Sequence, residues 1–303
     1  MAYHYTYAGL HIHSAIQIPE WTEFECLVNS GEPDVRIRLE DGSKGWETPA
    51  PDASVVCADE YRFSVPDIGA YRVMQGREIR VAPNPAAGWR EVRLFLLGSA
   101  WGALCYQRDL LVLHASAVCV DDGAIAFCAH PQMGKSTLAA YLTEAGHTLV
   151  SDDLTRIDIP TDGLPLIYPA ACRLKLWQDA LDALDWHNAS IERDHFRFEK
   201  FHLPLEGSGK HQPLPLFAIY ILEWGELGIT QLTGQAALHG LVSAATYRGP
   251  LLEPMDKMGW YYHQCLELIQ RIPIWQFRRP RDLAHMDQSV GYLREHWSSV
   301  LVR

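Results

Sequence analysis

The stretch AIAFCAHPQMGKSTLAAYLTEAGHTLVSDD, residues 124–153, decides the fold. Residues 124–128 are apolar and of strand length, and residues 136–145 place apolar side chains on one face of a helix. Gly146 stands where a helix favours a left-handed residue after its C-terminus, and residues 148–151 are predicted to form a second short strand. We therefore predict strand, loop, helix and strand, a crossover with two parallel strands whose ends lie side by side.

A loop between a strand and a helix N-terminus can bind an anion, because backbone N–H groups converge there and the helix dipole favours negative charge. Lys135 adds a charge that can reach the outer phosphates of a nucleotide, and Ser136 offers a hydroxyl to Mg²⁺. Asp152 and Asp153 would end the second strand near the terminal phosphate. One carboxylate could hold Mg²⁺ while the other takes the proton of an attacking hydroxyl.

The loop departs from the nucleotide-binding pattern G-x-x-x-x-G-K-[ST]. Ala129 stands where the first glycine is expected, and Pro131 removes one backbone N–H from the loop. Two interpretations stay open: a loop that binds nucleotide, and a loop that keeps the fold but has lost the phosphate. The strand, the helix and the aspartate pair around the motif favour nucleotide binding.

Four motifs resemble those of the HPr kinase/phosphorylase family, and most closely the HPr-kinase-like serine kinases of peptide-modification and lasso-peptide gene clusters. They are Leu113-His114-Ala115-Ser116-Ala117, Gly134-Lys135-Ser136-Thr137, Gly146-His147 and Val150-Ser151-Asp152-Asp153. A weaker similarity extends to about residue 295. The resemblance implies an α/β fold, namely a P-loop (HPr-kinase-like) core with a central sheet and flanking helices. It also implies ATP and Mg²⁺ as cofactors and an acceptor serine on a peptide or small protein, including a lasso-type precursor peptide.

The resemblance implies a role for individual residues. Asp152 would be the base, and His114 and Lys135 would act beside it at the phosphates. Ser136 and Asp153 would hold the metal ion. The residues expected to contact the nucleotide are His130, Gln132, Met133, Gly134, Lys135, Ser136, Thr137 and Lys200. The family's later glycine-rich segment, associated with phosphorylase activity, is not found, so a kinase without the reverse reaction is expected.

Composition limits the classes of partner. The formal net charge of −11 is opposite in sign to the basic surface that duplex nucleic acid or anionic lipid requires. No segment approaches the ~18 unbroken apolar residues of a membrane helix, and residues 1–10 lack a secretory signal. The seven cysteines are dispersed without a C-x-x-C pair, which is typical of reduced thiols. We expect a cytoplasmic protein without nucleic-acid or membrane partners, and a homo-oligomer stays open.

Two domains are predicted. Residues 1–88 alternate with a period of two in several runs, such as residues 3–7 and 35–39, and predict a strand-rich lobe with an antiparallel sheet. This lobe is either a scaffold or an edge for an extended peptide. Residues 89–303 predict the kinase core, beginning with a buried helix over residues 89–107.

The polar stretch 187–213 is predicted to be a flap over the active site, with a plain solvated loop as the alternative. Within it, Arg193, Arg197 and Lys200 could meet phosphate charge. A predicted strand over residues 172–177 points Arg173 and Lys175 one way, toward phosphates or toward water. The leading function is a kinase acting on a hydroxyl, and the alternatives are a nucleotide sensor without catalysis and an NTPase acting on water.

Overall fold

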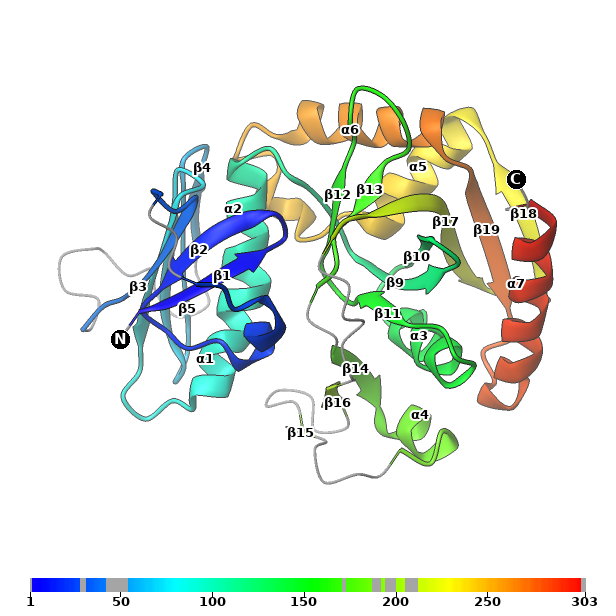
Figure 1. The fold of residues 1–303 in the computed structure, drawn as a ribbon, viewed down its shortest axis with the longest axis horizontal. Coiled ribbons are helices and arrows are strands. Elements are labelled where there is room, and N and C mark those ends of the chain that lie inside the picture. The colour runs from blue at the N-terminus through cyan, green and yellow to red at the C-terminus, as the bar shows by residue number, and fades with distance from the viewer. Residues whose placement is uncertain are drawn as a thin grey trace. The chain divides into compact units, whose positions relative to one another are not determined.

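The computed structural model describes residues 2–27, 31–41, 54–170, 173–186, 192–193, 200–204 and 212–300 (Figure 1). The chain is a mixed α/β protein that divides into two compact units. Unit 1 comprises Met1–Val112 and Tyr247–His263, and unit 2 comprises Leu113–Thr246 and Gln264–Arg303. This division differs from the predicted one between residues 88 and 89, because the helices over residues 89–107 group with the sheet of unit 1.

Unit 1 contains a sheet in the order β1-β2-β3-β7-β6-β5-β4. Two parallel pairings, of β3 with β2 and of β3 with β7, show that the prediction of a purely antiparallel sheet was wrong. Parallel neighbours need a long connection, and residues 15–34 supply one between β2 and β3. The strands are β1 (Tyr3–Tyr7), β2 (Leu10–Ser14), β3 (Val35–Leu39), β4 (Ser54–Cys57), β5 (Glu60–Val65), β6 (Gly69–Met74) and β7 (Glu78–Pro83).

The helices of unit 1 bury the apolar face of this sheet. The predicted helix over residues 89–107 is confirmed as α1 (Trp89–Phe95), a π-helical turn (Leu96–Ala100) and α2 (Trp101–Gln107). Tyr71 on β6 donates a hydrogen bond to the Val92 carbonyl at 2.9 Å. Trp101 packs edge-on against Trp21, with ring centroids 5.2 Å apart. The short helices of unit 1 are η1 (Pro19–Phe24) and η3 (Gly249–Leu251).

In unit 2, β10 (Gly123–Cys128) pairs in parallel with β17 (Leu214–Trp224), which pairs in parallel with β19 (Ile274–Arg279). On its other side β10 pairs antiparallel with β9 (Ala115–Val120), and β9 pairs antiparallel with β11 (Leu149–Ser151). The predicted parallel direction of β10 and β11 is therefore confirmed, but their predicted adjacency was wrong. A tight turn joins β9 to β10 and places β9 between them.

The remaining strands extend the same framework. β13 (Leu166–Ile167) pairs with the first residues of β17 and with β12 (Thr155–Asp158), and β18 (Gly228–Leu232) pairs with β19. β8 (Leu111–Leu113) leads into His114. A separate small sheet has the order β14 (Arg173–Trp177), β16 (Lys200–Pro204) and β15 (Glu192–Arg193).

Helices cover both faces of the β10–β17 region, which explains the near-continuous apolar runs of these strands. α3 (Lys135–Glu144) and α7 (Met286–Val300) pack with the face that carries Phe127 and Tyr220. α5 (Gly234–Ala245) packs on the other face, where Gly240 comes close to Ile221. The other helices are α4 (Gln178–Ala183), α6 (Met258–Arg271) and η4 (Leu283–His285). No helix in the described ranges combines the length and the apolar character needed to span a bilayer.

Candidate active site

The segment Ala129–Gly134, here called the β10–α3 loop, joins β10 directly to the N-terminus of α3. Its backbone is left-handed at Gln132 (φ 67°) and at Gly134 (φ 75°). The Met133 N–H donates to the His130 carbonyl at 3.2 Å, which closes the turn. The N–H groups of residues 134–137 donate no hydrogen bond to the described part of the chain. These amides are therefore available to an anion at the N-terminus of α3, and the binding of phosphate there stays a prediction.

Lys135 lies at the first position of α3 and is only 8 % exposed. Its Nζ donates to the Ala129 carbonyl at 3.0 Å, so the side chain folds back across the loop. Burial lowers the pKa of Lys135, and the negative charges of Asp152 and Asp153 act in the opposite direction. An ammonium in this position would gain from a phosphate that replaces the water it has lost.

Asp152, directly after β11, is held by two serines. The Ser116 hydroxyl donates to its Oδ1 at 2.5 Å, and the Ser136 hydroxyl lies 2.9 and 3.1 Å from its two carboxylate oxygens. The backbone N–H of Lys175 also donates to Oδ2 at 3.3 Å. Burial and then the charge of Asp153 raise the pKa of Asp152, although these hydrogen bonds oppose the shift. Asp152 is therefore the more basic carboxylate of the pair.

Asp153 has different partners because its own backbone is left-handed (φ 75°). Its Oδ2 accepts from Lys175 Nζ at 2.5 Å, and its Oδ1 lies 3.4 Å from Nε2 of His114. Burial alone would raise the pKa of Asp153, but Lys175 and His114 hold it well below its usual range. Asp153 is therefore a permanent anion that orients two cationic or proton-bearing side chains.

The structure brings most of the predicted residues together in unit 2. His114, Ser136, Asp152 and Asp153 form one network through the contacts above, with Lys175 joining the two aspartates. Lys135 lies close enough for the charges of both aspartates to act on it. Ser136 faces Asp152, however, and not Asp153, which the sequence had paired with it at the metal ion.

The other predicted nucleotide contacts lie on or beside the same loop. His130 and Gln132 are exposed, Thr137 is partly buried, and Met133 packs against the core of unit 2. Lys200 lies on β16 with its backbone opposite Trp177. The side chains of Lys200 and Arg193 fall outside the described part of the chain, as does Arg197. Residues 192–193 and 200–204 of the predicted flap are strands, and its movement stays a prediction.

Sequence reasoning missed Arg279, the last residue of β19. Its Nη2 donates to the carbonyls of Met133 and Gly134 at 3.1 and 3.0 Å, from 145 residues away in the case of Gly134. Motif spacing cannot reveal such a contact, because only the sheet order brings β19 near the loop. Ser116 and Lys175 were noticed in the sequence but were not assigned to the aspartates. The sequence did contain a signal for these contacts, because Asp152-Asp153 is followed by a predicted strand that carries Arg173 and Lys175 on one face.

The residues around Ser136 suit Mg²⁺. Hydroxyl and carboxylate oxygens are the hard ligands that this ion prefers, and Ser136 and Asp152 supply both kinds within hydrogen-bond distance of each other. Within the described ranges no group of three or more histidine, cysteine, aspartate or glutamate residues is arranged around a common metal position. Mg²⁺ in nucleotide sites needs no such group, since phosphates and water complete its coordination.

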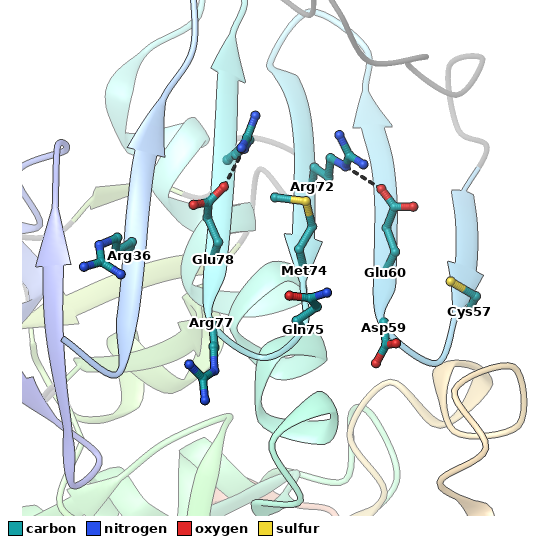
Figure 2. Close-up of a pocket in the computed structure, with 10 residues that line it drawn as sticks. Arg36, Cys57, Asp59, Glu60, Arg72, Met74, Gln75, Arg77 and Glu78 are labelled. Carbon is teal, nitrogen blue, oxygen red and sulfur yellow. Dashed lines mark hydrogen bonds and ion pairs between the residues drawn. The ribbon is translucent and has the colours of Figure 1, made fainter. Parts of the chain in front are cut away.

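Unit 1 contains a separate hollow of about 490 Å³ on the charged face of its sheet (Figure 2). Arg72 is hydrogen-bonded to Glu60 there, and Arg80 lies 2.5 Å from Glu78. Arg72 and Glu60 pair across the neighbouring strands β6 and β5, whereas Glu78 and Arg80 are two residues apart on β7. Each pair neutralises its own charges. The hollow therefore offers little net attraction to a small charged ligand. Whether the strand-rich lobe is a scaffold or an edge for an extended peptide stays a prediction.

Comparisons with known proteins give a distant structural likeness. No family model matches the chain, and no curated protein matches it in sequence. Among solved structures it is similar to the HPr(Ser) kinase/phosphatase from Coxiella burnetii, at 11 % sequence identity and a TM-score of 0.34. The match covers 62 % of this chain and 97 % of that one. The relationship is distant and concerns the fold alone.

Replacing Gly134 by alanine is expected to destabilise unit 2. The left-handed backbone disfavours any Cβ, and a Cβ on Gly134 would lie 2.6 Å from Arg279 Nη2. We expect a loss of about 1–3 kcal/mol in the free energy of unfolding, measured by urea denaturation. The matched control is Gly146→Ala, which has a similar φ of 93° but nothing within 4 Å of the added Cβ. Equal losses in the two variants would show that Arg279 does not constrain this position.

Proposed function

We propose that the chain binds a nucleoside triphosphate at the β10–α3 loop and transfers its γ-phosphoryl group to a hydroxyl. The observation that carries the proposal is the Ser116–Asp152–Ser136 cluster beside Lys135 at the N-terminus of α3. A free helix N-terminus, a lysine, a metal-binding hydroxyl and a basic carboxylate are the parts that phosphoryl transfer uses.

Each residue of the site would have a separate role in the reaction. The N–H groups of residues 134–137 and Lys135 would bind the phosphates, and Ser136 and Asp152 would hold Mg²⁺. When bound, Mg²⁺ neutralises phosphate charge. Asp152, the more basic carboxylate, accepts the proton of the acceptor hydroxyl. The acceptor oxygen then bonds to the γ-phosphorus as the bond from the γ-phosphorus to the bridging oxygen breaks, and the nucleoside diphosphate leaves. Asp153 keeps Lys175 and His114 oriented toward this region.

The acceptor we propose is a serine of a peptide or small protein, including a lasso-type precursor peptide, and it is supported by the motif resemblance alone. The cytoplasmic location, the lack of nucleic-acid and membrane partners, and any homo-oligomer stay predictions. The test is incubation with ATP, Mg²⁺ and candidate peptides encoded by neighbouring genes, followed by mass spectrometry for a phosphorylated serine. Asp152→Asn protein is the matched control. Phosphate on a peptide only with the wild-type protein would support the proposal.

A second function, nucleotide sensing without catalysis, is favoured by the altered loop, where Pro131 has no N–H to donate. Isothermal titration with ATP and Mg²⁺ separates the two. Binding accompanied by phosphopeptide formation supports the kinase. Binding without turnover on any peptide, and without ATP hydrolysis, supports the sensor. The absence of any heat of binding at millimolar ATP would contradict both the kinase and the sensor.

The pH dependence of the reaction should follow Asp152. A base works only when deprotonated, and kcat/KM for MgATP reports the enzyme before the metal ion arrives. This ratio is therefore expected to fall as pH drops through the raised pKa of Asp152. Asp153 stays ionised over the same range because its pKa lies well below the usual value. The acidic limb should therefore lie above the ordinary aspartate value of about 3.9.

Ser116→Ala sharpens this test. The Ser116 hydrogen bond stabilises the charged form of Asp152, so its removal should raise the pKa of Asp152 further and move the acidic limb to higher pH. The measurement is kcat/KM for MgATP at saturating peptide between about pH 4.5 and 8, a window around the unperturbed histidine and aspartate values. An unchanged limb in this variant would contradict the assignment of Asp152 as the base.

A further inference from the structure

Arg279 is buried beneath the β10–α3 loop at 1 % exposure. Its guanidinium lies over the ring of Trp224, 4.4 Å from the ring centroid, and its Nη1 lies 3.4 Å from the Met286 sulfur. Its Nε has no hydrogen-bond partner, and among the described residues no carboxylate charge acts on the guanidinium. Burial lowers its pKa to about 10, so the side chain still carries its charge at neutral pH.

A buried arginine without a counter-ion is costly, so its position calls for a compensating interaction. The partners it does have are the carbonyls of Met133 and Gly134. These carbonyls belong to the peptide groups whose N–H atoms are those of Gly134 and Lys135. In a trans peptide the C=O and N–H bonds point in opposite directions. With both carbonyls held on the guanidinium, the two N–H groups face away from it.

Those two N–H groups are among the amides that have no hydrogen-bond partner in the described part of the chain. A cation on a carbonyl also polarises its peptide group and makes the N–H a stronger donor. The guanidinium therefore adds both direction and charge to a loop that has lost one amide to Pro131 and has alanine in place of its first glycine.

We infer that Arg279 is a positioning residue for polyphosphate: it fixes the Gly134 and Lys135 amides toward the phosphates and supplies a buried positive charge behind them. This inference rests on the proposed nucleotide-binding function and extends it to a residue outside the loop motif. Arg279 acts through the loop and does not touch the nucleotide.

The test compares Arg279→Met and Arg279→Lys with the wild-type protein. The matched control is Arg278→Met on the same strand, because the Arg278 side chain is exposed. Isothermal titration with ATP, ADP, AMP and inorganic tripolyphosphate in the presence of Mg²⁺ gives each Kd and the fraction of competent protein. We expect Arg279→Met to weaken ATP and tripolyphosphate binding by about 10- to 100-fold, the range for hydrogen bonds to a charged group. AMP binding should change less, and Arg279→Lys should recover part of the loss.

The dependence on the number of phosphates separates positioning from mere stability. A variant that only folds less well lowers the competent fraction equally for all four ligands. If Arg279→Met does not fold, Arg279→Lys decides, since it keeps the charge but cannot hold both carbonyls as the planar guanidinium fork does. If the folded Arg279 variants bind ATP and tripolyphosphate with the same Kd as the wild-type protein, this inference is overturned and the proposed function still stands. A wild-type protein that binds neither ATP nor tripolyphosphate overturns both.

Discussion

Replacing Lys135 by alanine is expected to lower phosphoryl transfer by about 10³-fold, the upper end of what removing one preorganised charge-stabilising group costs. The Lys135 side chain folds back across the β10–α3 loop, and its ammonium is poorly solvated because the residue is only 8 % exposed. A charge in such a site stabilises developing negative charge far more than one in water. The measurement is single-turnover transfer of γ-phosphate to a peptide serine at saturating ATP.

A control variant shows whether the loss is specific to Lys135. Lys257→Ala is the matched control, because Lys257 lies in unit 1 and pairs there with Asp109 at 2.7 Å. That variant should transfer phosphate within about twofold of the wild-type rate, as for loss of one surface ion pair. A Lys135→Ala protein with the wild-type rate would remove the loop from the reaction and contradict the proposed function.

Asp152→Asn is expected to abolish transfer to a similar or larger extent. The amide cannot accept the proton of the attacking hydroxyl, and it is a weaker ligand than a carboxylate for a hard cation. The exposed Asp158 on β12 provides the control variant Asp158→Asn, which removes an equal charge outside the network. The same single-turnover assay applies, and the two variants should differ by about 10³-fold or more if Asp152 is the base.

The stability of Asp152→Asn should move in the opposite direction from its activity. Because burial and Asp153 raise the pKa of Asp152, the ionised carboxylate is less favourable in the folded than in the unfolded chain. Above that raised pKa the charge therefore subtracts its full amount from the free energy of unfolding. The loss shrinks as pH falls through the raised pKa and disappears below the unfolded value of about 3.9. At pH 7 the asparagine protein should melt at the wild-type temperature or higher. A clear drop in Tm would show that Asp152 is structural.

Much of the fold was accessible from the sequence because local pattern decides local structure. The apolar run of β10, the helical face of α3 and the position of Gly146 each depend on neighbours within a few residues. The order of the strands in a sheet does not depend on such near neighbours. The parallel pairing of β3 with β7, and the place of β9 between β10 and β11, depend on how long connections return to a sheet. Periodicity carries no information about that return.

The site divides in the same way. Lys135, Ser136 and the aspartate pair could be predicted, because the geometry of one crossover places them together. The different hydrogen-bond partners of Asp152 and Asp153 could not be predicted. They depend on the left-handed backbone at Asp153 and on side chains from two other strands. Arg279 was missed for the same reason, because its contacts with the loop exist only once β19 has joined the sheet.

The burial of Lys135 and Arg279 also determines how an anion would approach the site. The chain as a whole carries a formal charge of −11, so a polyanion diffusing toward it meets net repulsion at long range. Lys135 and Arg279 lie too deep to offset that repulsion in the surrounding water, and they attract only at contact. Attraction by these two side chains would then act only at short range. Moderate salt should therefore quicken the encounter, the reverse of what a site ringed by surface lysines would show.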